Sequence, residues 1–402
     1  EKEQSLTLAN FTAHRSPERF IYRGLSLNSR HIDWHMFSEV SMRQYMKDEI
    51  RERLQMIRDT AESADGRCIT PSHETLLHLA AGLGEVQLLN RLLQRHADPN
   101  VQIILPQQAF PSIPDSEQGN TPLTYACQPG MDDSTPLPVH NRISCLNLLI
   151  QYGADVNKPG PLGWPPLVIT CVAGIGGAPY EEAALFLLKC GADISLQPEL
   201  KGKKTSLLTW ATAAGYPLLV RKLCEAGYDP NFRGEMVPPL LSLNLNTPNT
   251  ALQIAHILLE YGADVNAAMP ASTTLPETTG DTALLNLCRQ LAFIDVSQLP
   301  QIRELVSLFI SEGADVNHQN AAGETPLMAC CRGMLLGDDS LDRLKLGIAR
   351  LLLDHRADPS LRDKYGRTAL QRIGNRSNEH LQMVLKYLPE LSAPPLPKKE
   401  NR

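Results

Sequence analysis

The sequence predicts an all-α fold, in which short helices pair and the pairs stack into a solenoid. Two short phrases carry this prediction, one recurring seven times and the other eight times along the chain. Composition agrees with it. Of 402 residues, 43% are hydrophobic and only 5% aromatic, whereas Pro (30) and Gly (26) are plentiful. This apolar fraction exceeds that of disordered chains, and the Pro and Gly content suits short helices joined by turns.

The first phrase closes each repeating unit and reads Gly-Ala-Asp-Val-Asn in its clearest copies. Each copy follows an apolar stretch with helical spacing. Gly permits the left-handed residue that ends a helix, and Asp and Asn then shape a turn. The seven copies lie at residues 97–100, 153–157, 191–195, 227–231, 262–266, 313–317 and 357–360.

The second phrase opens each unit and predicts the start of a helix. The Thr hydroxyl can cap free N–H groups, and Pro at the first helical position loses no hydrogen bond. A helix pair this short cannot bury its apolar face alone, so neighbouring units must stack. The eight positions equivalent to the opening Thr are residues 75, 121, 165, 205, 238, 282, 325 and 368.

The two phrases together resemble the ankyrin repeat, whose Thr-Pro-Leu-His-x-Ala signature is nearly written out at Thr75–Ala80. The resemblance covers about residues 72–389. It implies an ankyrin-repeat α-solenoid of eight units that binds a protein partner. It also implies that His78 forms hydrogen bonds at a helix start, and that Asn157, Asn266 or Asn317 could be substrates of asparaginyl hydroxylation.

The spacing of the opening phrases departs from that family. The steps between them are 46, 44, 40, 33, 44, 43 and 43 residues, and only one equals the usual ankyrin period of 33. The remaining repeats carry insertions. We therefore predict three parts: a helical N-terminal cap region over 1–70 with an amphipathic helix over 40–61, about eight irregular repeats over 71–390, and a disordered Pro/Lys tail over 391–402.

The insertions and three aromatic residues are the candidate partner-binding features. Irregular insertions favour contact with a particular partner, although surface loops also tolerate length changes at little cost. Trp164 precedes an opening Pro near a hairpin, which favours a surface role. Trp210 and Tyr125 lie on first helices, as binding anchors or as space-filling residues. Three apolar residues of the longest insertion are either tucked onto the array or offered to a partner: Ile103, Leu105 and Phe110.

The sequence favours no catalytic residues, no metal and no cofactor. The nine cysteines are scattered without a Cys-x-x-Cys pair, which indicates a reducing compartment. Four of them follow an opening Leu by four residues, where a small buried residue is expected: Cys127, Cys171, Cys288 and Cys331. The eleven histidines form no ligand set, and phosphate-loop, nucleophile-elbow and zinc-protease motifs are absent from the sequence.

We therefore expect a cytoplasmic, monomeric protein-interaction module that acts through its concave groove and insertions. The net charge of −6 argues against nucleic acid as partner and hints that the partner surface is not strongly acidic. No apolar run approaches the roughly 20 residues of a membrane span.

Three alternatives stay open. The irregular repeats are similar to those of secreted bacterial effectors, which would make this chain a targeting portion in the host cytoplasm with any catalytic region outside it. The missing initiator Met permits such a lost segment. Residues 20–24 resemble the strand of ADP-ribosyltransferases that carries an NAD-contacting Arg, here Arg23, but too few residues precede the repeats for that domain. Residues 394–399 fit a PxxPxK peptide for an SH3-type groove.

Overall fold

The computed structural model describes fourteen segments that fall into two compact units, residues 75–214 and residues 215–392, considered separately below. The predicted cap helix, Arg23, Leu105, Phe110 and residues 393–402 of the predicted C-terminal tail lie outside the described residues. The first two residues of that predicted tail, Leu391 and Ser392, instead lie in the 3₁₀ turn Pro389–Ser392, where Leu391 is buried. The boundaries of the three predicted parts stay predictions. The described segments are 75–103, 119–128, 139–160, 163–174, 180–195, 199–200, 203–204, 206–231, 237–271, 278–291, 299–332, 339–373, 384–386 and 388–392.

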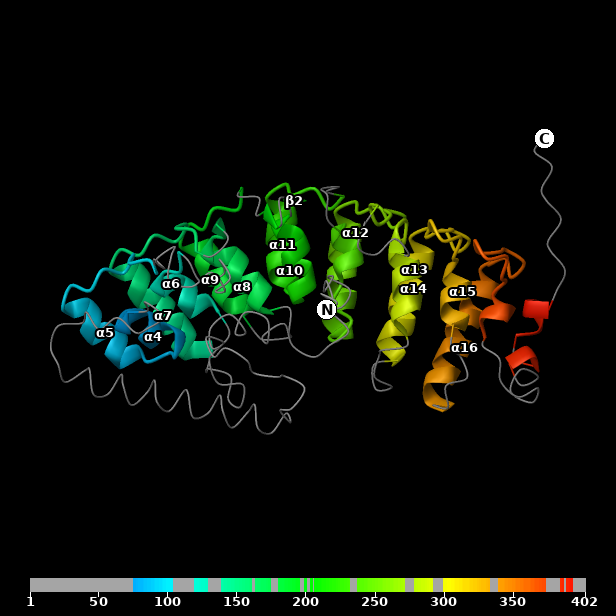
Figure 1. The fold of residues 1–402 in the computed structure, drawn as a ribbon, viewed down its shortest axis with the longest axis horizontal. Helices are drawn as coiled ribbons and strands as arrows, with labels where there is room; N and C mark the ends of the chain where they lie inside the picture. The colour runs from blue at the N-terminus through cyan, green and yellow to red at the C-terminus, as the bar shows by residue number, and fades with distance from the viewer. Residues whose placement is uncertain are drawn as a thin grey trace, which may run out of the picture. The chain divides into compact units, whose positions relative to one another are not determined.

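The first unit is a double layer of helices (Figure 1). The first helices of successive repeats, α4, α6, α8 and α10, contact one another in that order, and the second helices α5, α7 and α9 form the other layer. Their bounds are α4 Leu76–Gly82, α5 Val86–Gln94, α6 Pro122–Cys127, α7 Val139–Gln151, α8 Pro166–Gly174, α9 Glu181–Lys189 and α10 Leu207–Ala214. A two-residue antiparallel ladder joins β1 (Glu199–Leu200) to β2 (Lys203–Lys204).

The second unit repeats the arrangement (Figure 1). The 3₁₀ turn η3, the helices α13 and α15 and the 3₁₀ turn η7 contact in succession, and α11, α12, α14 and α16 form the other layer. Their bounds are α11 Pro217–Glu225, η3 Pro239–Ser242, α12 Pro248–Glu260, α13 Ala283–Gln290, α14 Leu299–Ser311, α15 Pro326–Cys331, α16 Asp339–Asp354, η7 Leu370–Arg372 and η8 Pro389–Ser392. The predicted all-α solenoid class is confirmed.

The opening phrases cap helices as predicted. The hydroxyls of Thr75, Thr121, Thr282 and Thr325 each accept the N–H of the residue three positions on. The prediction fails at two of the eight phrases, where only the 3₁₀ turns η3 and η7 form. After η3, the Asn244 side chain accepts the N–H of Asn246 at 3.1 Å, and this local turn competes with helix continuation.

The closing phrases end the second helices and tie neighbouring repeats together. Gly residues take positive φ at five of the seven copies, and His96 (φ 63°) and Arg356 (φ 68°) take that position in the other two. The Asn side chain then bridges to the next repeat. Asn157 donates to Gly191 O at 3.2 Å and accepts from Asp193 N at 2.7 Å, and Asn266 makes the same pair of bonds to residues 313 and 315. Hydroxylation of these residues stays a prediction.

Buried cations close two of the short first helices at the insertions. Arg142 of α7 donates to the carbonyl of Ala126 and, at 2.5 Å, to that of Gln128, so it satisfies the end of α6. Lys345 of α16 donates to Arg332 O at 3.2 Å, just after α15. Both cations are buried, at 2% and 1% exposed. In both repeats, a cation of the second helix therefore donates the hydrogen bonds that N–H groups of a longer first helix would have donated to these carbonyls.

The cysteine prediction is confirmed. Cys127, Cys171, Cys288 and Cys331 are at most 1% exposed, each on a first helix. Burial raises the pKa of the Cys127 thiol to about 11 and that of Cys330 to about 12, so these groups stay protonated and unreactive at neutral pH. They act as small apolar packing residues.

Candidate protein-interaction surface

The hairpins between repeats end at one recurrent position, the residue just before the opening Thr or Pro, which we call the hairpin-exit position. Three of these residues close the hairpin tip with the same backbone bond. Gly160 N donates to Trp164 O at 2.8 Å, Asn320 N to Glu324 O at 3.2 Å and Asp363 N to Arg367 O at 3.0 Å. The scaffold is therefore shared, and the exit side chains differ in each repeat. The described exit residues are Asn120, Trp164, Lys204, Val237, Asp281, Glu324 and Arg367.

Trp164 is the predicted anchor that the structure leaves partly exposed. Its ring lies 5.8 Å from the ring of Trp210, measured between centroids, at a tilt of 52°. Trp210 lies on α10 and is 6% exposed, so it is a buried packing residue. The Trp164 ring packs against it. An aromatic ring held by a second ring loses little side-chain entropy on binding a partner. The role of Trp164 in binding stays a prediction.

Tyr125 and Ile103 also take the packing alternative. Tyr125 is 2% exposed and meets the ring of His78 edge-on, with centroids 5.3 Å apart. Ile103 is fully buried, and its backbone pairs with Asn120 and Gly119 at 2.9 Å across the hairpin. Neither side chain is accessible as a surface anchor. For Tyr125 the reason is that its ring faces the neighbouring repeat, where it contacts His78, and sequence spacing does not reveal this contact.

His78 fulfils the hydrogen-bonding role that the resemblance implied. Its Nδ1 accepts the Thr75 N–H at 3.2 Å, so Nε2 carries the proton and donates to Asn120 O at 3.0 Å. The ring is buried, and this burial lowers its pKa to about 4. His78 is therefore neutral at physiological pH and bridges two repeats.

The second unit holds a chain of alternating charges beneath its hairpins, which the sequence did not predict. Arg289 donates to Asp281 at 3.1 Å and ion-pairs with Glu324 at 2.7 Å. Asn320 adds a hydrogen bond to Asp281 at 2.7 Å. Burial raises the pKa of Asp281 to about 6, because one guanidinium shared between two carboxylates only partly offsets the desolvation.

The chain of charges continues into the last repeat. Arg372 pairs with Glu324 at 3.0 Å and with Asp363 at 3.1 Å, and Arg367 pairs with Asp363 at 2.9 Å. The three carboxylates, including Asp281, are at most 2% exposed, whereas Arg367 is 43% exposed. The negative charges therefore lie inside, and positive charge faces outward.

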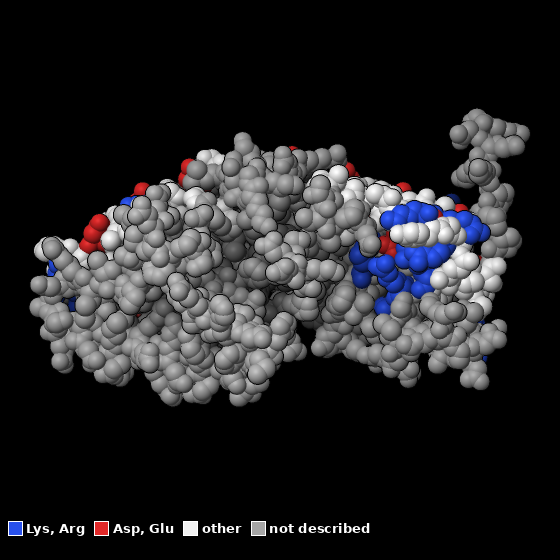
Figure 2. Space-filling view, viewed as in Figure 1, with Lys and Arg blue, Asp and Glu red and all other residues white. Residues whose placement is uncertain are grey.

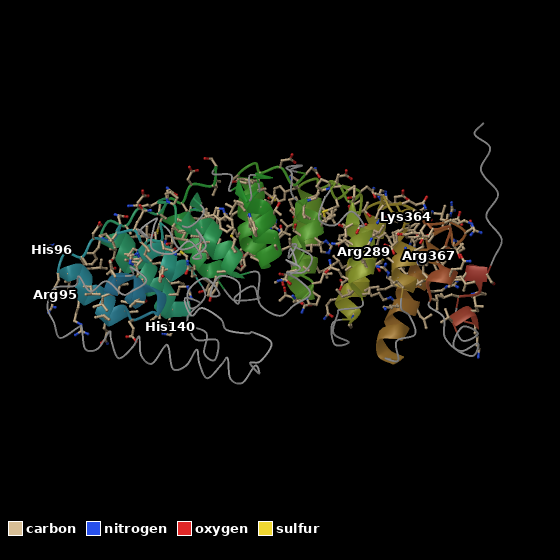
Figure 3. The ribbon with its side chains drawn as sticks, in the orientation of Figure 1. Arg95, His96, His140, Arg289, Lys364 and Arg367 are labelled. Atoms are coloured by element: carbon tan, nitrogen blue, oxygen red, sulfur yellow. The ribbon has the colours of Figure 1, made fainter. Side chains whose placement is uncertain are left out.

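Tyr365 lies on top of this charge chain and was missed by the sequence reasoning. It is 67% exposed, the highest value among the large hydrophobic side chains that are described. The signal was present in the hairpin as Lys364-Tyr365-Gly366-Arg367, an aromatic residue flanked by cations. Figure 3 labels Lys364, Arg367 and Arg289 on the same part of the second unit.

Among the described residues, no group of three or more His, Cys, Asp or Glu side chains is placed to hold a metal ion. No described helix is long and apolar enough to cross a membrane. The buried thiols and the neutral, bonded His78 are likewise structural groups. The catalytic alternative that uses Arg23 lies outside the described residues and stays untested.

Stacked helix pairs with capped starts, left-handed ends and exposed hairpins define a repeat protein of the solenoid class. Two family models match parts of the chain. Residues 72–103 and 118–160 match the model of the ankyrin repeat, and residues 293–393 match the model of three ankyrin repeats. The chain therefore contains ankyrin repeats.

The similar proteins come from distant sources. Protein phosphatase 1 regulatory subunit 27 of Homo sapiens is 39% identical over 51 residues, which cover 13% of this chain and 30% of that protein. YahD of Escherichia coli (strain K12), named as an ankyrin repeat protein, is 28% identical over 199 residues, covering 49% of this chain and 85% of YahD. The ankyrin repeat protein FPV031 of Fowlpox virus is 28% identical over 177 residues, 44% of each chain.

Proposed function

We propose that this protein recognises a protein partner through the groove formed by its hairpin tips and first helices. Ankyrin repeats are protein-interaction modules, which supports the general class. One observation supports the more specific proposal. The exit residues Asn120, Asp281 and Glu324 are buried, whereas Trp164 is partly exposed at its exit position, with its ring 5.8 Å from that of the buried Trp210. Aromatic side chains held in this way are common binding anchors.

A recovery experiment with the full chain tests this site. The tagged wild type and Trp164→Ala are expressed in the cells that make the protein, and partners are recovered by proximity labelling. We expect Trp164→Ala to lose most of the recovered partner, since truncating an anchor typically costs about 2 kcal/mol or more of binding free energy. Tyr152→Ala is the matched control, because Tyr152 is 41% exposed on the same unit but lies at the end of α7.

Trp164→Phe separates binding from folding, since it keeps an aromatic ring on Trp210. Helical circular dichroism checks that each variant is folded. Equal partner recovery by the wild type and a folded Trp164→Ala would contradict the proposed site.

In the alternative proposal, the chain is the targeting portion of a secreted bacterial effector in the host cytoplasm, and it still binds a protein partner. Cytoplasmic location and a monomeric state are part of the same proposal. The full-length gene tests the effector reading, since it reveals whether a catalytic or membrane-active segment adjoins the repeats.

A further inference from the structure

The last described hairpin of the second unit exposes an aromatic ring between two cations. The Lys364 ammonium lies 5.1 Å from the centroid of the Tyr365 ring, and the Arg367 guanidinium carbon lies 4.8 Å from it. Both distances fall within the range of cation–π attraction. Arg332 and Arg362 are exposed nearby in the fold, and Arg332 lies close enough to Arg372 to act on its charge. We call Arg332, Arg362, Lys364, Tyr365 and Arg367 the Tyr365 surface.

This surface is positive because its carboxylates are buried. Asp363 and Glu324 are 0% and 2% exposed, and they face the inner guanidinium of Arg372. In the described part of the chain, no carboxylate lies within ion-pair distance of Lys364 or Arg362. Figure 2 shows the result, with Lys and Arg side chains gathered around uncharged residues and only a little red among them.

The hairpin that carries the ring is held firmly. Asp363 accepts the backbone N–H groups of Tyr365 and Arg367, each at 2.9 Å. Lys364 N donates to Ala322 O of the preceding hairpin at 2.9 Å. Gly323 takes φ +70° there, and a Cβ on it would lie 3.0 Å from Lys364 N. The backbone of the Tyr365 surface is therefore fixed before a ligand arrives, which lowers the cost of binding.

We propose that the Tyr365 surface binds an acidic peptide segment of a protein partner. Carboxylates of the segment pair with Lys364, Arg362 and Arg367, and an apolar side chain of the segment packs on Tyr365. Arg is suited to this pairing because its planar fork matches a carboxylate. This inference rests on the proposed protein-binding function and adds the chemical class of the partner.

A peptide segment fits the observations better than a nucleic acid does. The whole chain carries a net charge of −6, so a long polyanion would meet repulsion outside the patch. Tyr365 is a single exposed ring, whereas single-stranded nucleic acid is usually bound by several stacking rings along a basic groove. A short acidic segment needs only the local charge.

Fluorescence anisotropy with the full chain tests the proposal. The probes are a short fluorescein-labelled Glu-rich peptide that contains one Leu, and a matched peptide in which Gln replaces every Glu. We expect the Glu peptide to bind more tightly than the Gln peptide, and added salt to weaken its binding. The double variant Arg362→Glu/Lys364→Glu should weaken it about tenfold or more. Tyr365→Ala should weaken both peptides, because it removes the apolar contact.

Lys189→Glu is the matched control, since Lys189 is an exposed cation of the first unit and its reversal changes the net charge in the same direction. It should leave the affinity within about twofold of the wild type. Lys364→Gln is the milder second variant, and circular dichroism confirms folding of each. Equal binding of the Glu and Gln peptides, or an unchanged affinity in the double variant, would overturn the proposal.

A single-stranded oligonucleotide of equal charge is the third probe. Tighter binding of this oligonucleotide, lost in the same double variant, would assign the surface to nucleic acid and overturn the peptide proposal. Failure here is distinct from failure of the proposed function. In that case Trp164→Ala would still abolish partner recovery while the Glu peptide failed to bind.

Discussion

Two pairs of residues occupy equivalent positions in the two units and use different chemistry. In the first unit the exit residue Asn120 accepts a hydrogen bond from Gln128 at 3.2 Å. In the second unit the exit residue Asp281 accepts one from Arg289 at 3.1 Å. Both donors lie eight residues after the exit residue, at the end of the first helix. The same geometry is neutral in one unit and ionic in the other.

The difference teaches how charge spreads through stacked repeats. The side-chain oxygen of Asn120 accepts two local hydrogen bonds, from Thr124 at 2.9 Å and from Gln128 at 3.2 Å. The Arg289 guanidinium pairs with Asp281 and also with Glu324 of the next repeat. Glu324 in turn pairs with Arg372. A buried charge requires a buried countercharge. Starting from the ionic exit residue Asp281, positive and negative side chains therefore alternate through the buried pairs as far as Arg367, which belongs to the Tyr365 surface.

The largest effect should come from removing one member of that chain. Arg372→Met leaves Glu324 and Asp363 short of a partner in a buried setting, so we expect the second unit to lose about 3–5 kcal/mol of unfolding free energy. The neutral counterpart Gln128→Met should cost the first unit only about 1–3 kcal/mol. Urea denaturation followed by circular dichroism measures both losses. Equal losses for the two variants would contradict the contrast between an ionic and a neutral repeat.

The comparison also shows what the sequence could and could not predict. Phrases that act within a few residues were predicted correctly, including the Thr caps, the buried Cys127 and the bonded His78. These features depend on local backbone geometry, and the repeated spacing reveals that geometry directly. The same reasoning missed the Arg372 pairs with Glu324 and Asp363, because they form only when hairpins distant in sequence stack.

The candidate site was predicted only in part, for the same reason. Trp164 lies at the hairpin exit as expected, but burial of Tyr125, Trp210 and Ile103 depends on which neighbour covers each side chain. Net charge was a poor guide as well. It counts the buried carboxylates of the charge chain equally with the exposed Lys364, so a mildly acidic chain hides a local positive surface.

The second effect should be opposite pH dependence in the two units. Burial lowers the pKa of His78 from 6.5 to about 4, so the first unit loses stability as pH falls from about 6.5 to about 4. Burial raises the pKa of Asp281 from 3.8 to about 6, so the second unit loses stability as pH rises from about 4 to about 6. Each change should amount to about 3 kcal/mol, since one pKa unit corresponds to about 1.4 kcal/mol.

Hydrogen exchange of peptides from α4 and α13, corrected for intrinsic exchange rates at each pH, separates the two effects. His78→Gln should remove the pH dependence of α4, and Asp281→Asn should remove that of α13, since neither new side chain ionises. The same sign of pH dependence in both helices would show that the ionic chain does not set the behaviour of the second unit.

The smallest effect should be the same in both units, because it depends on the backbone and not on charge. His96 and Arg356 take positive φ values of 63° and 68° where five other closing phrases have Gly. A side chain in this conformation is strained, so we expect His96→Gly and Arg356→Gly each to stabilise its unit by about 0.5–1 kcal/mol. Asn317 keeps its 3.0 Å bond in the second variant, since it bonds the backbone carbonyl of residue 356. Urea midpoints measure the gains, with His96→Ala and Arg356→Ala as controls that remove the side chain and keep the strain. A gain at one site only would mean that Arg356 or His96 makes a compensating side-chain contact, and the two units would then differ in more than the charge of their exit residues.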